Sequence, residues 1–272
     1  MTDQYAVIGR PISHTKSPLI HGLFADATDQ VLTYSAIEGS AQDFAGDVAR
    51  FRAAGGRGMN ITAPFKLDAY ALATQASDRA HLAKAANALK FEAGEVIAEN
   101  FDGIGLLRDI EVNLGNPLAG KRVLLLGAGG AVRGALLPFL QAQPGELVMV
   151  NRDLRKAQVL AWELKVSALR TCGYQALAGE KFDIVINATS ASLVGELPPV
   201  PPEVFDGTAL AYELAYGKGL TPFLRMAKEQ GVVQLADGVG MLVEQAAQAF
   251  AWWRGVHPET RSVIDRLTVP LV

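Results

Sequence analysis

The segment KRVLLLGAGGAVRGALLPFL, residues 121–140, constrains the fold of this chain more than any other segment. An apolar run leads into a glycine turn, and the turn leads into a long stretch with helical character. A dinucleotide-binding turn needs glycine where the backbone bends sharply and where it approaches a pyrophosphate, while free N–H groups at the helix N-terminus hold phosphate. The segment therefore predicts a dinucleotide-binding βα unit, although glycine turns also occur in plain strand-to-helix joints.

The residues after this unit repeat the alternation of strand and helix. We expect strands at 147–151, 182–190, 207–216 and 232–238, with helices at 153–165 and 221–231. Consecutive strands joined by helices become parallel neighbours. The pattern predicts a doubly wound, Rossmann-like parallel sheet. A proline-rich segment at 195–205 is expected to be a surface loop.

The first third of the chain predicts a second α/β domain. Strands are expected at 5–9, 32–37 and 57–62, helices at 17–27 and 40–55, and a hairpin at 87–100 that turns at Ala93-Gly94. A helix at 102–115 leads to the second domain. The last helices, at 241–255 and 259–268, have no strand after them, so we expect them to pack back on the first domain. The predicted domains are 1–103, completed by 239–272, and 104–238.

Composition excludes several classes of protein. The net charge of the 272 residues is −3, without a basic block, which argues against nucleic acid as a partner. Cys172 is the single cysteine, and the four histidines are scattered, so neither a disulfide nor a metal site is expected. The N-terminus lacks the features of a signal peptide, and no run of about 18 apolar residues suggests a membrane span. We expect a cytoplasmic enzyme or binding protein with a small-molecule ligand and no membrane partner.

The segment VNRDLRK, residues 150–156, bears on the choice of dinucleotide. An NAD site usually has an acidic residue at the end of this strand, which takes the ribose 2′-hydroxyl. Here Asn151 and Arg152 come first, and Lys156 lies one helical turn later, which suits the 2′-phosphate of NADP. Asp153 favours NAD, unless it caps the following helix. The pattern indicates NADP, with NAD possible; the alternative is that Arg152 is only a solvated loop charge.

Seven motifs, in order along residues 5–250, together resemble the shikimate dehydrogenase family: YAVIGRPISHTKSPLIH, NITAPFK, AANAL, ENFDGIG, GAGGAVRG, NATSAS and DGVGMLVEQA. The resemblance implies an N-terminal substrate domain and a Rossmann domain, with the active site in a cleft between them. It also implies NADPH-dependent reduction of 3-dehydroshikimate to shikimate, a step of aromatic amino-acid biosynthesis by way of chorismate.

The resemblance assigns roles to individual residues. Lys66 and Asp102 become the catalytic pair, and a lysine beside a carboxylate suits proton transfer to a ketone. Thr15 and Ser17 would hold the substrate carboxylate with Tyr216 beside it, and Thr62, Asn87 and Gln245 would bind ring hydroxyls. The implied cofactor contacts are Gly127, Ala128, Gly129, Gly130, Ala131, Asn151, Arg152, Lys156, Ala188, Thr189, Gly238 and Met241. Without the resemblance, we would expect Lys66 to be a surface lysine, Asp102 to be a turn residue and Ser17 to be a helix N-cap.

This chain departs from the family pattern near the predicted pocket. Thr15 stands where serine is usual, Ala88 and Phe101 replace threonines, and Glu213 replaces a common aspartate. We expect Ala88 and Phe101 to make the surroundings of Asp102 more apolar and more crowded. The first hypothesis is therefore an NADP-dependent shikimate dehydrogenase, monomeric or homodimeric. The alternatives are a paralogue that oxidises quinate or another hydroxy acid, possibly with NAD, and a binding protein of low activity.

Overall fold

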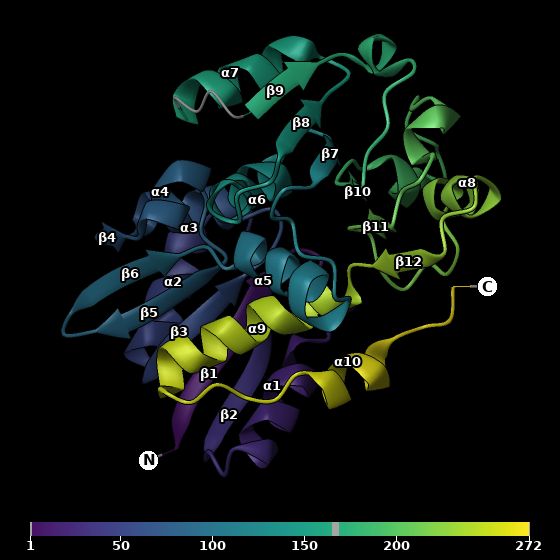
Figure 1. The fold of residues 1–272 in the computed structure, drawn as a ribbon. Coiled ribbons are helices and arrows are strands. Elements are labelled where there is room, and N and C mark those ends of the chain that lie inside the picture. Colours follow the sequence, from purple (N-terminus) through teal and green to yellow (C-terminus); the bar gives the residue numbers. More distant parts are fainter. Residues whose placement is uncertain (1, 165–168, 272) are drawn as a thin grey trace. The chain divides into compact units, whose positions relative to one another are not determined.

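The computed structural model describes residues 2–164 and 169–271 (Figure 1). The chain divides into two compact units, of which the first combines Met1–Gly105 with Val243–Arg266 and the second combines Leu106–Leu242 with Leu267–Val272. The sequence placed the chain's last residues with the first domain. In the structure they belong to the second unit, where Leu271 packs against the core.

The first unit is built on a mixed six-stranded sheet. Its strands are β1 (Asp3–Gly9), β2 (Leu32–Glu38), β3 (Gly56–Ile61), β4 (Gln75–Ala76), β5 (Ala88–Glu92) and β6 (Glu95–Glu99), in the order β2-β1-β3-β5-β6-β4. β1 is parallel to β2 and β3, whereas β5 is antiparallel to β3 and β6. The predicted hairpin is confirmed: Ala93 and Gly94 both have positive φ, at 50° and 89°, as a tight hairpin turn requires.

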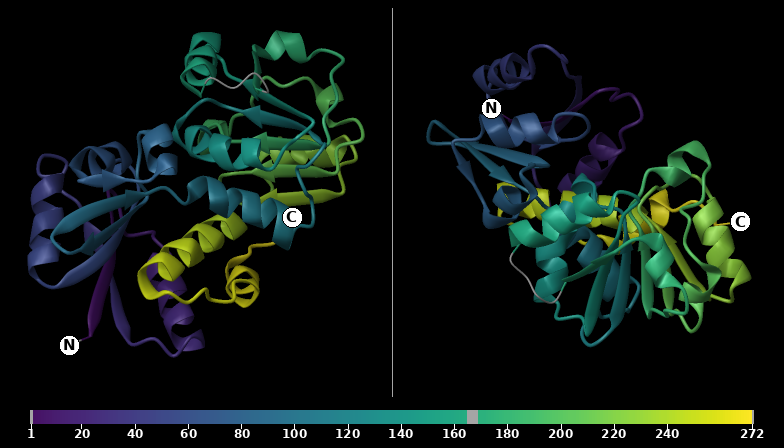
Figure 2. Two further views of the ribbon diagram at one scale, coloured as in Figure 1. Left: turned by 60° about the vertical axis from the view of Figure 1, so that its left-hand side comes forward. Right: turned by 90° about the horizontal axis from the view of Figure 1, so that it is seen from above.

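Helices cover both faces of this sheet (Figure 2). They are α1 (Ser17–Ala27), α2 (Phe44–Ala53), α3 (Lys66–Leu72), α4 (Asp78–Ala83), α9 (Val239–Arg254) and α10 (Arg261–Leu267). Alternate residues of a strand point to opposite faces. Accordingly, Ala6 and Ile8 of β1 pack with α2 and α3, whereas Tyr5 stacks on Trp253 of α9 at 4.8 Å between ring centroids.

Two local predictions for this unit needed correction. The helix expected at 40–55 begins only at Phe44, because the Asp43 side chain caps it by accepting the Gly46 N–H at 3.1 Å. The short helices α3 and α4 were not predicted. The helix expected at 102–115 is present as α5 (Asp102–Arg108), which continues into a π-helical turn, η1 (Asp109–Asn113).

The second unit contains the predicted doubly wound sheet, with all strands parallel. They are β7 (Arg122–Leu126), β8 (Glu146–Val150), β9 (Leu169–Cys172), β10 (Ile184–Asn187), β11 (Leu210–Glu213) and β12 (Gln234–Asp237), in the order β12-β11-β10-β7-β8-β9. Its main helices are α6 (Gly130–Gln141), α7 (Leu154–Leu164) and α8 (Pro222–Glu229). The end of the predicted helix at residue 165 lies outside the described residues.

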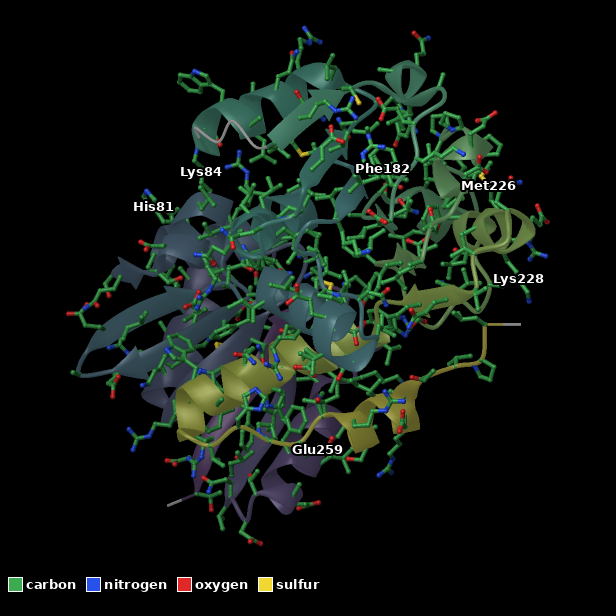
Figure 3. All side chains as sticks on the ribbon, viewed as in Figure 1. His81, Lys84, Phe182, Met226, Lys228 and Glu259 are labelled. Carbon is green, nitrogen blue, oxygen red and sulfur yellow. The ribbon has the colours of Figure 1, made fainter. Side chains whose placement is uncertain are left out.

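Both faces of this sheet are buried, as expected for a parallel sheet. Val123 and Leu125 of β7 belong to one apolar cluster and Leu124 and Leu126 to another. Phe182, which is labelled in Figure 3, belongs to the second cluster. The Arg122 guanidinium lies 4.9 Å from the centroid of the Phe182 ring.

The proline-rich segment is not simply a surface loop. It ends in a 3₁₀ turn, η4 (Pro202–Phe205), and Val200, Val204 and Phe205 are buried in the core of the second unit. Two further 3₁₀ turns are η2 (Tyr174–Leu177) and η3 (Ala191–Val194). Among the helices that the structure describes, none has the length and apolar character needed to cross a membrane.

Candidate active site and nucleotide site

The predicted catalytic pair is joined in the first unit. Lys66 is the first residue of α3 and Asp102 is the first residue of α5. The Lys66 Nζ lies 2.6 Å from Asp102 Oδ2, and the two side chains are 34% and 10% exposed. The ammonium therefore reaches solvent while it is hydrogen-bonded to a nearly buried carboxylate, an arrangement that suits proton transfer to a ligand.

Asn87 fixes the orientation of the Asp102 carboxylate. Its Nδ2 donates to Asp102 Oδ1 at 2.8 Å and to Gln245 Oε1 at 3.0 Å, and its Oδ1 accepts the Phe101 N–H at 2.8 Å. Asn87 is 2% exposed, so these bonds are shielded from water. The structure thus brings together four predicted site residues, Lys66, Asp102, Asn87 and Gln245, in one hydrogen-bonded network.

The two residues predicted to hold the substrate carboxylate also lie together. Thr15 Oγ1 is 3.2 Å from Ser17 Oγ and accepts the Ser17 N–H at 3.3 Å. Ser17 does not act as an N-cap, because that position is Lys16 and no side chain caps α1. Thr62 directly follows β3, where its N–H donates to the Ile8 carbonyl at 3.0 Å. Tyr216 belongs to the second unit, follows β11 and is 42% exposed, and partial burial raises the pKa of its phenol.

The expectation for Ala88 and Phe101 was wrong. Phe101 does not crowd the Asp102 carboxylate: its ring packs with Ala88 and Ala249, makes an edge contact with Trp252 at 5.7 Å, and lies under the Arg79 guanidinium. Residues 101 and 102 are adjacent, but the phenyl ring turns into the apolar contact with α9, whereas the carboxylate turns toward Lys66. The small Ala88 leaves room for that ring.

Three residues that the sequence did not assign form a polar layer beside Asn87. Tyr34 donates to Asn60 Oδ1 at 2.7 Å, and Asn60 Nδ2 donates to the Asn87 carbonyl at 3.3 Å. His21, 1% exposed, stacks on Tyr34 with ring centroids 4.1 Å apart. Burial lowers the pKa of His21 to about 3, so its imidazole is neutral. A lone histidine on the apolar side of the helix at 17–27 was the signal available in the sequence.

In the second unit, most of the predicted cofactor residues line one pocket of about 700 Å³. They are Gly127, Ala128, Gly129, Asn151, Arg152, Lys156, Ala188 and Thr189. Asp153, which the sequence weighed as an NAD contact or a helix cap, also lines the pocket. The sequence missed a further set of lining residues, Tyr174, Ser190, Ala191, Val194, Glu196, Pro198 and Pro199. Gly130, Ala131, Gly238 and Met241 are not among the residues that line it.

The glycine turn has the geometry of a phosphate cradle. Gly127 has a φ of +114°, and a Cβ there would come within 3.0 Å of the Ala188 carbonyl oxygen, so only glycine fits without strain. A Cβ at Gly129 or Gly130 would meet nothing within 4 Å. The backbone at the N-terminus of α6 is therefore open to a ligand, and its unpaired N–H groups suit an anion.

The lining of the pocket includes two basic residues, which suit an anionic ligand group, and two acidic ones, Asp153 and Glu196. Arg152 and Lys156 are exposed and line it. Asp153 takes the alternative role: its Oδ1 accepts the Arg155 N–H at 3.1 Å at the start of α7. Tyr174 lines the same pocket; burial raises the pKa of its phenol, and the charge of Arg152 opposes that rise.

Of the other predicted cofactor residues, Ala131 is the second residue of α6, whereas Gly238 and Met241 lie where β12 meets α9. A Cβ at Gly238 would come within 2.2 Å of the Leu214 carbonyl oxygen, so glycine permits a close backbone approach. The Met241 N–H donates to the Tyr212 hydroxyl at 3.3 Å, and Tyr212 donates to Asp109 at 2.7 Å. Of the described residues, no group of three or more acidic, histidine or cysteine side chains forms a candidate metal site.

A doubly wound sheet with a glycine cradle, together with a hydrogen-bonded lysine–aspartate pair in an α/β substrate unit, defines the class of two-domain, dinucleotide-dependent dehydrogenases. Three family models that match successive parts of the chain support this class. The shikimate dehydrogenase substrate binding domain matches residues 7–89, shikimate / quinate 5-dehydrogenase matches 110–194, and the shikimate 5′-dehydrogenase C-terminal domain matches 238–268. The chain belongs to the shikimate dehydrogenase family.

Individual relatives extend over almost the entire chain. A protein named shikimate dehydrogenase (NADP(+)) from Nitrosospira multiformis is 51% identical, and the match covers 98% of both chains. A protein of the same name from Nitrosomonas europaea is 52% identical, and the match covers 97% of this chain and 96% of the relative. The crystal structure of an Ael1 enzyme from Pseudomonas putida is 70% identical, with all of both chains covered and a TM-score of 0.98. The shikimate 5-dehydrogenase of Thermus thermophilus in complex with NADP(H) and shikimate is 29% identical, with 97% and 98% covered and a TM-score of 0.87.

Proposed function

We propose that this protein catalyses the reversible, NADP-dependent reduction of 3-dehydroshikimate to shikimate. The observation that carries the proposal is the 2.6 Å contact between Lys66 and Asp102, which provides a charged proton donor fixed by a nearly buried acid. The names of the relatives, which are about 50% identical over almost the whole chain, support the same activity. The names of these relatives do not include quinate, although the family model that matches residues 110–194 covers shikimate / quinate 5-dehydrogenases.

In the reductive direction, Lys66 donates a proton to the ketone oxygen as the carbonyl carbon is reduced. Asp102 stabilises the ammonium before the transfer and orients the amine after it. Asn87 holds the second carboxylate oxygen at 2.8 Å, so Asp102 cannot rotate away from the lysine. In the oxidative direction, the neutral amine accepts the hydroxyl proton. General acid–base catalysis of this kind contributes about 10²–10⁴-fold to a rate.

The substrate residues have complementary chemistry. Thr15 and Ser17 offer two neighbouring hydroxyl groups for a carboxylate, while Asn87, Gln245 and Thr62 are polar groups suited to ring hydroxyls. The methyl group of Thr15 narrows the space that a serine would leave. We propose that the first unit binds the substrate and the second unit binds the dinucleotide.

The residues of the second unit fit NADP. The glycine cradle suits the pyrophosphate, and Arg152 with Lys156 suits the 2′-phosphate, since Arg and Lys bind phosphate by charge-assisted hydrogen bonds. NADPH, when bound, supplies the hydride for the reduction. The Asp153 carboxylate is engaged at the start of α7, so it competes little for a ribose hydroxyl.

Absorbance at 340 nm tests the proposal, with shikimate or quinate and NADP⁺ or NAD⁺ combined in four separate reactions. Turnover that is fastest with shikimate and NADP⁺ supports it. A preference for quinate or NAD⁺ would change the assigned substrate or cofactor, and no turnover in any reaction would overturn the enzymatic function. The cytoplasmic location, the monomeric or homodimeric state and the absence of a nucleic-acid partner stay predictions; light scattering on a sizing column checks the oligomeric state.

A further inference from the structure

Glu213, the last residue of β11, is a buried acid that the proposed reaction does not use. Its side chain is completely buried. Its Oε2 accepts from Ser192 Oγ at 2.5 Å, Asn187 Nδ2 at 2.9 Å and Thr221 Oγ1 at 3.2 Å, and its Oε1 accepts the Ala215 N–H at 3.3 Å. Burial raises the pKa of this carboxyl, and the hydrogen bonds oppose that rise.

The donors to Glu213 come from two connections at the carboxyl edge of the sheet, one at the end of β10 and one between β11 and α8. Asn187 ends β10, Ser192 lies in the turn after it, and Thr221 is the N-cap of α8. The connection after β10 lines the nucleotide pocket, whereas Thr221 of the other connection does not. Ala188, Thr189 and Ala191, which lie between Asn187 and Ser192, are among the lining residues.

The contact with Glu213 determines which way the Asn187 amide faces. A carboxylate accepts hydrogen bonds, so the amide NH₂ of Asn187 must point toward it. The Asn187 Oδ1 is thereby turned toward Thr189, where it accepts the backbone N–H at 3.1 Å and the hydroxyl at 2.7 Å. One charge thus sets the orientation of an amide, and the amide sets the orientation of a residue in the pocket wall.

We propose that Glu213 is a positioning residue for the dinucleotide, acting through Asn187 on the pocket loop at residues 188–191. The proposal rests on the proposed function, because it assumes that the pocket holds NADP. Groups that are hydrogen-bonded in the bound geometry before the ligand arrives lower the ordering cost of binding. Glu213 supplies this order to one wall of the pocket without touching the ligand.

The same chain of hydrogen bonds defines what Thr189 offers to the ligand. Its hydroxyl hydrogen is directed to Asn187, and its oxygen accepts the Ala191 N–H at 3.3 Å. One lone pair remains, so Thr189 can accept a hydrogen bond but cannot donate one. Phosphate oxygens only accept at neutral pH, so the Thr189 hydroxyl suits a hydrogen-bond donor of the dinucleotide, such as a ribose hydroxyl or an amide N–H, rather than a phosphate oxygen.

The variant E213Q tests the proposal, because it keeps the shape of the side chain and removes the charge. The protein is titrated with NADPH, and the change in NADPH fluorescence measures binding. We expect the Kd for NADPH and the KM for NADP⁺ to rise about tenfold, in line with the loss of a hydrogen bond to a charged group. The KM for shikimate should stay within about twofold of wild type. Asn187→Ala breaks the chain one link later and should have the same effect, so it serves as the test if E213Q does not fold.

T221V is the matched control for stability. It removes one donor to Glu213 and the cap of α8, but it leaves the Asn187 contact intact. We expect a lower Tm with an unchanged Kd for NADPH. A folded E213Q or N187A that binds NADPH as wild type does would overturn the positioning role, as would equal weakening in T221V. Wild-type protein that binds no NADPH would instead overturn the proposed function.

Discussion

The ammonium of Lys66 lies 2.6 Å from the carboxylate of Asp102, although 36 residues separate the two positions. Each residue begins a short helix that follows a strand of the first sheet after a brief connection. An acidic group at a helix N-terminus is stabilised by the helix dipole, whereas a cation there is destabilised. Lys66 therefore depends on Asp102 for its placement, and the pair behaves as one functional unit.

Replacing the ammonium tests this unit directly. We expect Lys66→Ala to lower kcat for shikimate oxidation by about 10²–10⁴-fold, because the transferred proton loses its acceptor. The KM for shikimate should change less than about threefold, since other residues hold the ring. Steady-state kinetics at 340 nm measure both constants. Lys90→Ala is the control, because Lys90 is also ion-paired in the first unit, with Glu92 at 3.0 Å; near-normal turnover of Lys66→Ala would remove the lysine from the mechanism.

The cofactor preference depends on Arg152. We expect R152Q to reduce kcat/KM for NADP⁺ about 10–100-fold while the value for NAD⁺ changes little, because only NADP carries a 2′-phosphate and a charge-assisted hydrogen bond is worth about 1.5–3 kcal/mol. R155Q is the matched control: Arg155 is also exposed and follows on the same segment, but it does not line the nucleotide pocket. An equal loss of kcat/KM with NADP⁺ and NAD⁺ would show that Arg152 does not bind the 2′-phosphate.

The sequence predicted best those parts of the fold that short segments determine. The glycine cradle at Gly127 follows from a strand, a turn and a helix that are contiguous, and the turn at Ala93-Gly94 follows from a local conformational preference. Short elements were missed, because α3, α4 and β9 contain seven, six and four residues and show too little periodicity.

The catalytic pair and the pocket wall illustrate what local patterns leave out. Lys66 and Asp102 could be paired only through the resemblance, since nothing near either residue specifies the other. Tyr174 and Glu196 line the nucleotide pocket, but their segments reach it through the packing of the second unit. The direction of the Phe101 ring was also beyond prediction, because it depends on the space that Ala88 and Ala249 leave beside α9.

The Phe101 ring provides a test of that packing. We expect Phe101→Ala to lower the free energy of unfolding by about 3–5 kcal/mol, the usual cost of truncating a buried phenylalanine, because the contacts with Trp252 and Arg79 are lost. Urea unfolding followed by tryptophan fluorescence measures the change. Val31→Ala, at a side chain that is 73% exposed, should change it by less than about 0.5 kcal/mol. A small loss of stability with a large rise in the KM for shikimate would indicate that the Phe101 ring lies in the substrate pocket after all.

His21 makes the stability of the first unit depend on pH. Burial lowers its pKa from the ordinary 6.5 to about 3, so between these values the unfolded chain binds a proton that the folded chain does not. Stability from this residue is fully present above about pH 6.5 and is lost as the pH falls toward 3, with a slope of up to about 1.4 kcal/mol per pH unit. The His21 Nε2 has no hydrogen-bond partner among the described residues, and a side-chain hydrogen bond with Asn60 only partly opposes the effect of burial on the pKa of His21.

Unfolding free energies measured by urea at several pH values check this dependence. We expect His21→Gln to flatten the profile between pH 6.5 and 4, because the uncharged amide takes up no proton in either state. His14→Gln, at an exposed position, should leave the wild-type slope in place. A profile that His21→Gln leaves as steep as wild type would show that other groups cause the acid loss. A steep profile lost only with His21 would identify the buried imidazole, stacked on Tyr34, as the group that takes up a proton when the first unit unfolds in acid.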